Sequence, residues 1–186
     1  MMKKFALFLF LATTTLFVSC SDDDEDPIEI DQSIIPGTWN LTDIRSENGQ
    51  ATATVQGIPL SGDYSVTGKD YTATATFTTS DSENEPNTVT GSGGFTLVAS
   101  FSLPTQDPIE VEQNVPDLIG AGEWTVSGNT LSITVQQETT SYEITALTAQ
   151  SMTLKITIDE DTTVDIGGDS VPVSITGDQF FVLTKQ

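Results

Sequence analysis

The sequence contains no histidine among its 186 residues and only one cysteine, Cys20. The absence of histidine excludes Ser-His-Asp and Cys-His catalysis and removes the commonest protein ligand for zinc and haem iron. Carboxylates remain for acid–base chemistry, but the spacing of the 27 Asp and Glu residues singles out no pair suited to a glycosidase cleft. We therefore expect a protein that is not an enzyme and that uses neither a metal nor a cofactor.

Basic residues are also scarce, because only six Lys and Arg stand against the 27 acidic residues, giving a formal net charge of −21. A nucleic-acid-binding surface needs clustered Lys and Arg, so this class of partner is excluded. An acidic surface is also repelled by anionic membranes, so any membrane attachment must depend on something other than charge. We expect a monomer that binds no nucleic acid.

The N-terminal residues 1–19 have the layout of a signal peptide. Lys3 and Lys4 form a positive segment, and residues 5–18 form an apolar run that is broken only by threonines at 13–15. This run is too short to cross a bilayer comfortably, and it shows no polar face at helical spacing that would suit a buried core helix. We expect residues 1–19 to be removed as a leader.

The leader ends in the sequence FVSC at residues 17–20, which resembles the lipobox of bacterial lipoproteins. The resemblance implies that Cys20 carries a diacylglycerol through a thioether and that its freed amine takes a further acyl chain such as palmitate. Two or more chains anchor a protein stably, whereas one holds it only weakly. No other cysteine competes for this thiol, so Cys20 is the expected lipid attachment and the contact with the membrane.

A dense acidic tract follows the cysteine directly, at Ser21, Asp22, Asp23, Asp24 and Glu25. Like charges this close repel one another and cannot pack, which is typical of a solvated linker. The tract also resembles the lipoprotein export signal that sends lipoproteins of some bacteria to the outer face of the outer membrane. We expect residues 20–33 to be a lipidated, disordered acidic tether and the protein to face the cell exterior.

Residues 34–186 read as one all-β domain. Residues 71–79 and 95–103 alternate apolar and polar side chains, which indicates a sheet with one dry and one wet face. Short alternating segments follow from Trp124 to the C-terminus, with turns expected at 127–129 and 177–178. Residues 80–94 and 104–121 are expected to be long connections, the second with one helical turn near 116–119. This spacing favours an antiparallel barrel or sandwich.

The start of the domain, Gly37-Thr38-Trp39, resembles the G-x-W motif that opens the first strand of lipocalins. The resemblance implies an antiparallel lipocalin-like β-barrel of eight strands, with Trp39 across its closed end. A basic residue near the end of the last strand covers this tryptophan in lipocalins, and Lys185 stands at the matching place. A β-sandwich is the alternative architecture.

A barrel interior raises the question of a ligand. Small and large apolar residues are expected on the dry faces, at Ala73, Ala75, Phe77, Phe95, Ala99 and Trp124. Barrels of eight strands either hold one small ligand or are filled by side chains. The first reading predicts a surface lipoprotein that binds a small apolar or amphipathic molecule. The alternative is a non-enzymatic structural module with a filled barrel that contacts proteins or glycans through its loops.

The acidic segment 159–169 has two readings. Several carboxylates suit calcium, but Val164 and Ser170 stand where the EF-hand pattern needs glycine and glutamate, so an acidic hairpin loop is the preferred reading. The same segment contains D-T-T and D-S-V, which resemble a bacterial acceptor motif for O-glycans. This resemblance marks Thr162 and Ser170 as candidate glycosylation sites.

Overall fold

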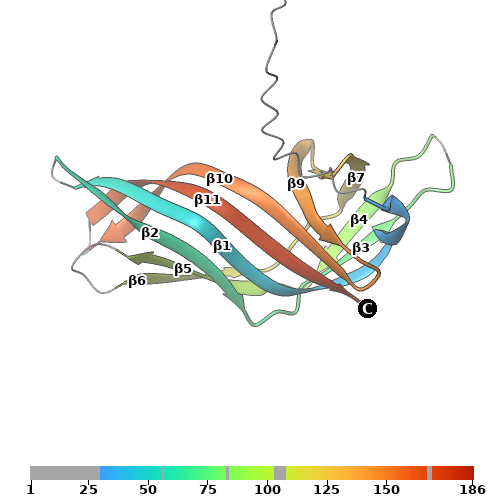
Figure 1. The fold of residues 1–186 in the computed structure, drawn as a ribbon, viewed down its shortest axis with the longest axis horizontal. Coiled ribbons are helices and arrows are strands. Elements are labelled where there is room, and N and C mark those ends of the chain that lie inside the picture. The colour runs from blue at the N-terminus through green and yellow to red at the C-terminus, as the bar shows by residue number, and fades with distance from the viewer. Residues whose placement is uncertain (1–29, 56, 83, 103–107, 167–168) are drawn as a thin grey trace, which may run out of the picture.

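The computed structural model describes residues 30–55, 57–82, 84–102, 108–166 and 169–186, and they form one antiparallel sheet (Figure 1). A short 3-10 helix, η1 (Gln32–Ile34), comes before the strands. The strands are β1 (Gly37–Val55), β2 (Ile58–Lys69), β3 (Thr74–Thr78), β4 (Thr88–Ser92), β5 (Phe95–Ser102), β6 (Ile109–Val115), β7 (Gly122–Ser127), β8 (Thr130–Val135), β9 (Glu138–Leu147), β10 (Ser151–Ile166) and β11 (Asp169–Lys185). Within the described residues, no helix is long and apolar enough to cross a membrane.

Eight of the strands close into a barrel in the order β1-β3-β4-β7-β8-β9-β10-β11, because β11 pairs back onto β1. The closing ladder is antiparallel and runs from Trp39 opposite Lys185 to Ala53 opposite Val173. The remaining strands β2, β5 and β6 extend the sheet from the second half of β1. The prediction of an all-β, antiparallel barrel is confirmed, and the sandwich alternative is wrong.

Three strands are too long for the barrel and leave it together. On its other edge β1 pairs with β3 over residues 37–40 and then with β2 from Arg45 onwards. In the same way β10 pairs with β9 only over residues 152–155, although it stays paired with β11 up to Ile166. Beyond the barrel, the distal halves of β10, β11 and β1 join β2, β5 and β6 in an open curved sheet, which we call the trough (Figure 1).

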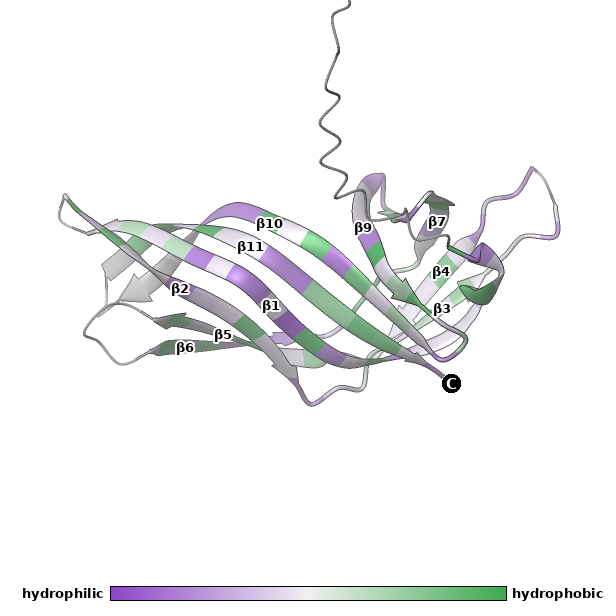
Figure 2. Cartoon of the chain, viewed as in Figure 1, coloured by the Kyte–Doolittle hydropathy of each residue, from purple (hydrophilic) through white to green (hydrophobic). Residues whose placement is uncertain are grey.

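Apolar side chains line the inner face along the whole length of this sheet. Figure 2 shows hydrophobic and hydrophilic residues alternating in bands along β1, β10 and β11, as a half-wet sheet requires. The buried residues form a barrel cluster (Ile35, Trp39, Ala75, Phe77, Val89, Ile119, Trp124, Leu131, Ile133, Ile144, Met152, Leu154, Leu183), a central cluster (Leu41, Ile44, Val66, Ala73, Phe95) and a trough cluster (Ala51, Phe101, Val173, Ile175). Each large side chain that is fully buried contributes about 1.5–3 kcal/mol to stability.

Two segments expected to be connections contain strands. Residues 88–92 form β4 and pair with β3, and residues 109–115 form β6 and pair with β5 from Phe101 opposite Ile109 to Phe95 opposite Val115. The sequence IEVEQNV of β6 does alternate, but the prolines on both sides of it obscured the pattern. The helical turn expected at 116–119 is also wrong, because these residues form bends.

The turn expected at Gly177-Asp178 is wrong as well, because β11 runs straight through it. Opposite this point β1 contains a bulge between Glu47 and Gln50, and Gly177 has a φ of 147°. A Cβ atom at Gly177 would lie 2.8 Å from the Gly49 Cα, and one at Gly49 would lie 2.0 Å from the Tyr64 carbonyl oxygen. The two glycines therefore permit a close approach of strands between the barrel and the trough.

The ordered structure begins before the expected domain boundary at residue 34. Ile30 and Ile34 pack against the barrel cluster, and the side chain of Asp31 accepts a 3.0 Å hydrogen bond from the Ser33 amide at the start of η1. Apolar contacts and a cap therefore hold the last residues of the predicted tether. Cys20 and the acidic tract 21–25 lie outside the described residues.

We expect Gly49→Ala to destabilise the protein by about 2–4 kcal/mol, because its methyl group would collide with backbone that cannot move without breaking the β1–β2 ladder. Gly128→Ala is the matched control, since Gly128 has a φ of 59° but open space around it. That substitution should cost only about 1 kcal/mol of left-handed backbone strain. Urea unfolding of the two variants measures both values. Equal losses would contradict the close packing at Gly49.

Candidate ligand pocket and the closed barrel end

Trp39 lies at the closed end of the barrel, where β1 meets both β3 and β11. It stands opposite Ala75 on one side and Lys185 on the other, and its side chain is completely buried. The indole Nε1 donates a 2.8 Å hydrogen bond to the carbonyl of Ile35. The small side chain of Ala75 leaves room for the indole, because directly opposed residues on one face lie only about 5 Å apart.

Lys185 covers the tryptophan from the last strand. Its Nζ lies 5.0 Å from the centre of the Trp39 ring and donates a 2.6 Å hydrogen bond to the carbonyl of Ile34. A Cβ atom at Gly37, whose φ is 131°, would lie 2.8 Å from the Lys185 Cε. Gly37, Trp39 and Lys185 therefore lie together in one cluster. The carbonyls of Ile34 and Ile35, at the end of η1 and at its C-cap, accept the hydrogen bonds of the lysine and the tryptophan.

The six residues expected to line a cavity do not share one. Ala75, Phe77 and Trp124 belong to the barrel cluster, where the Phe77 and Trp124 rings meet edge to face at 5.7 Å. The Trp124 Nε1 donates a 3.2 Å hydrogen bond to the carbonyl of Thr78. The remaining three belong to the central cluster, Ala73 and Phe95 as buried members and Ala99 as a half-buried neighbour. The closed half of the barrel is therefore filled by its own side chains.

A cavity of about 220 Å³, which we call the central pocket, lies next to this filled half. It is lined by Phe95, Leu97, Val115, Leu118, Ile119, Tyr142, Leu154, Gln179, Phe181 and Leu183. Tyr142 comes from β9 and Leu154 from β10, so the pocket lies where the β9–β10 pairing ends. Tyr142 and Phe181 contact each other edge to face at 6.1 Å, which fixes the wall between β9 and β11.

Of the residues that the structure describes, none with a charged side chain lines the central pocket. Its polar side chains are the amide of Gln179 and the hydroxyl of Tyr142. Burial raises the pKa of Tyr142, so its hydroxyl stays neutral and able to donate a hydrogen bond throughout the physiological range. The pocket therefore offers an apolar wall and two neutral polar groups.

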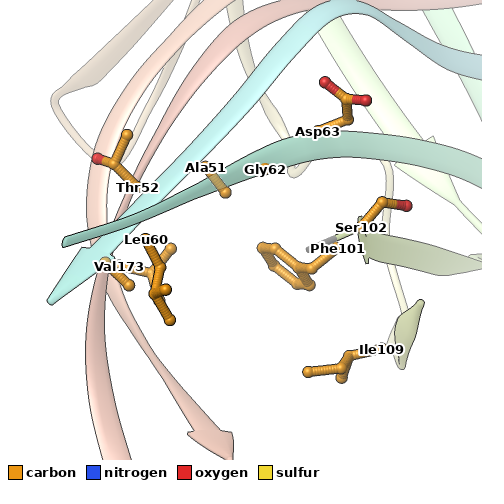
Figure 3. Close-up of a pocket in the computed structure, with 10 residues that line it drawn as sticks. Ala51, Thr52, Leu60, Gly62, Asp63, Phe101, Ser102, Ile109 and Val173 are labelled. Atoms are coloured by element: carbon orange, nitrogen blue, oxygen red, sulfur yellow. The ribbon is translucent and has the colours of Figure 1, made fainter. Parts of the chain in front are cut away.

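The trough contains a second cavity, but it is much smaller. Its volume is about 30 Å³, which is space for about two or three water molecules. Figure 3 shows Leu60, Phe101, Ile109 and Val173 facing this space, while the carboxylate of Asp63 points away from it. The trough therefore has an apolar inner face but no room for a small-molecule ligand in this cavity.

The acidic segment expected to be a hairpin loop is mostly strand. Residues 159–166 belong to β10 and pair with β11, which begins at Asp169. Among the described residues, no three His, Cys, Asp or Glu side chains are grouped so that they could hold a metal ion. Thr162 is exposed opposite Val173, and Ser170 stands opposite Asp165, although its side chain is outside the part described.

Most of the central pocket was not recognised from the sequence. Of the six expected cavity residues, only Phe95 lines it. Tyr142 and Phe181 lie in alternating segments, and this alternation was a usable signal that they face inwards. Leu118 lies in the irregular connection between β6 and β7, where the sequence has no alternating pattern. Its place in the pocket depends on where these two strands lie.

Trp39→Ala should cost about 3–5 kcal/mol of unfolding free energy, because it removes the largest buried side chain of the closed end. Lys185→Met keeps the methylene stem over the ring and removes only the ammonium, so we expect a loss of about 1–2 kcal/mol. Denaturant unfolding of residues 30–186 measures both. A loss below about 1 kcal/mol for Trp39→Ala would mean that the tryptophan does not support the barrel.

Comparison with known proteins adds no family to this picture. A scan against protein-family models finds no match, and a search of curated proteins finds no significant match. The conclusions on function therefore rest on the geometry of the barrel and its pocket.

Proposed function

We propose that this protein binds a small, neutral, apolar or amphipathic molecule in the central pocket. The observation that carries the proposal is an uncharged cavity of about 220 Å³ at the open side of the eight-stranded barrel, between β9, β10 and β11 on one wall and β5 and the end of β6 on the other. Small-molecule sites are concave and mostly apolar, with a few polar groups that orient the ligand. The Tyr142 hydroxyl and the Gln179 amide are suited to that orienting role.

The size and charge of the pocket narrow the ligand class. Typical small-molecule sites measure about 300–1,000 Å³, so this pocket suits a compact molecule or one end of a longer one. No basic side chain lines it to pair with a carboxylate or sulfonate, and the protein is strongly acidic overall. A buried anion without a partner is costly, so a hydroxyl, ketone or ester group fits better than an acid.

The alternative of a barrel that is filled by its own side chains describes the closed half of the barrel. The barrel cluster packs the closed half, and η1 lies across its end with Ile35 fully buried. A ligand therefore enters from the other side, where β9 and β10 diverge at Tyr142. If the domain bound no ligand, we would expect side chains to fill the space where β9 and β10 diverge. The central pocket lies in that space instead.

Two related fluorescent probes test the ligand class. N-phenyl-1-naphthylamine is neutral, and 1-anilinonaphthalene-8-sulfonate has a similar ring system with one negative charge. We expect residues 30–186 to bind the neutral probe at least about tenfold more tightly, which is about 1.4 kcal/mol, because the pocket supplies no cation. Fluorescence titration measures both affinities.

Filling variants locate the binding site. Leu97→Trp should weaken the neutral probe by at least about tenfold, because the indole would occupy the pocket. Leu60→Trp is the matched control, since Leu60 lines the trough cavity and should leave binding unchanged. Weak binding of both probes, or equal effects of the two substitutions, would contradict the proposal.

We further propose that the domain is displayed on the outer face of the outer membrane by a lipid on Cys20. The support is the FVSC sequence at 17–20 and the acidic tract at 21–25. Ile30 is the first residue that the structure describes, and ten residues, from the proposed anchor Cys20 to Glu29, precede it. Ten residues span at most about 36 Å, which would keep the domain near the membrane surface.

Cys20→Ala should release the protein from the membrane fraction and remove the mass of the acyl chains, because no second cysteine can take the lipid. Cell fractionation and intact-mass measurement test this. Replacing Asp22, Asp23 and Asp24 by Ala tests the address separately, since a retained protein should then resist protease added to whole cells. Unchanged membrane partition and mass of Cys20→Ala would contradict lipidation.

A further inference from the structure

We propose that the free edge of β6 binds an extended segment of a partner protein in which Lys or Arg alternates with apolar residues. The segment would add a strand to the trough by antiparallel or parallel pairing with Ile109–Val115. Of the residues of this strand only Val115 also lines the central pocket, so the edge is otherwise distinct from the proposed ligand site.

The backbone of β6 is the first reason. β6 is the last strand of the sheet, and within the described residues it pairs only with β5. Edge strands present unpaired N–H and C=O groups, and extended peptides bind such edges by adding a strand. The seven residues of β6 span about 24 Å, which is a normal strand length.

The apolar inner face is the second reason. Ile109, Val111 and Val115 stand opposite Phe101, Ala99 and Phe95, so they share the face that lines the trough. Val111 is 43% exposed, and it is one of only two large apolar side chains that are exposed in the described part of the chain. Its exposure follows from the open sheet, because no strand of the described part of the chain lies beyond β6 to cover it. Alternate apolar side chains of an added strand would cover Val111 and Ile109.

The charge of the two rims is the third reason. Glu110 and Glu112 are exposed on β6, and Asp159, Glu160 and Asp161 are exposed on β10, the other rim of the trough. Glu160 stands opposite Ile175, a buried residue of the trough cluster, so its side chain lies on the inner face of the trough. Burial raises the pKa of Tyr64, and the negative charge of Glu160 raises it further. Both rims therefore favour a basic strand.

Among the described residues, the one basic side chain that pairs with an acid of these rims is Lys69. Lys69 contacts Glu112 at 2.6 Å, while Arg45 contacts Asp43 and Glu47. Lys155 contacts Glu143, and Lys185 is held over Trp39. Glu110 and the three acids of β10 are left as the attractive charges for a partner.

The same charges argue against a second copy as the occupant. Pairing of two β6 edges would bring the Glu110 and Glu112 side chains of both copies together, and each chain carries a net charge of −21. Acidic residues also protect an edge strand from self-pairing. Glu110 and Glu112 would repel a second acidic copy but attract a basic strand. The same two residues can therefore prevent self-pairing and favour a basic partner.

The test uses the full 186-residue chain in nanodiscs of phosphatidylcholine, with empty nanodiscs as the blank. The probe is a fluorescein-labelled peptide of about nine residues with alternating Lys and Val, a length typical of a strand. Two matched peptides carry Glu in place of Lys, or Pro in place of alternate Val residues. Anisotropy gives the affinities in about 20 mM and about 150 mM salt, and hydrogen exchange locates the contact.

We expect the Lys–Val peptide to bind more tightly at low salt and to slow exchange of the amides in 109–115, whereas the Glu and Pro peptides should not. Glu110→Lys should weaken binding by at least about fivefold, because it reverses a charge at the edge. Glu123→Lys makes the same change of net charge at an exposed position on β7, and should have little effect. Neither variant should alter binding of N-phenyl-1-naphthylamine, so this outcome is distinct from that of the pocket.

Three results would overturn the proposal. The first is binding without slowed exchange in 109–115. The second is equal weakening by Glu110→Lys and Glu123→Lys, which would indicate attraction to the net charge alone. The third is a dimer in sedimentation whose β6 amides are already protected without peptide, which would make a second copy the occupant.

Discussion

The pairing of the first long strand with the last holds this structure together. The β1–β11 ladder runs from Trp39 opposite Lys185 to Ala53 opposite Val173, and it is the contact that turns an open sheet into a barrel. It also brings Lys185 over the Trp39 ring and lets η1 accept hydrogen bonds from both residues. The closed end, its tryptophan and its covering lysine therefore all depend on the same ladder.

The lengths of β1, β10 and β11 divide the molecule into two compartments. Between the barrel and the trough, β1 exchanges its neighbour β3 for β2, and β10 loses its neighbour β9 after Lys155. β11 stays paired with β1 and β10 in both compartments. The change occurs beside the bulge between Glu47 and Gln50, where Gly49 and Gly177 permit a close approach. The barrel keeps a cavity where the strands diverge, while the trough keeps an apolar face and a free edge. The ligand proposal belongs to the first compartment and the partner proposal to the second.

The four basic residues of the described part of the chain all make contacts within the fold. Lys185 covers the barrel end, Lys69 and Lys155 join neighbouring strands through glutamates, and Arg45 lies 5.0 Å from the centre of the Phe180 ring. The outer surface is therefore left to carboxylates and to hydroxyl pairs such as Thr38 with Thr76. Such a surface repels anions and other copies of the chain, and it would favour the neutral ligand and the basic partner that we propose.

The sequence by itself determined the all-β class and the inward faces of residues 71–79 and 95–102, and the resemblance to the lipocalin G-x-W motif indicated the meeting of Gly37, Trp39 and Lys185. These features depend on alternation and on a barrel joining its first and last strands, which are local or topological rules. The position of the cavity could not be predicted by these rules. An alanine on the inner face leaves a cavity only if the opposing side chain is also small, and the residue opposite Ala75 is Trp39. Tertiary structure alone decided that β6 is an edge, that β11 passes through Gly177, and that Leu118 reaches the pocket. Each of these depends on which strands become neighbours, and pairing between residues far apart in the chain is not encoded in any short stretch of it.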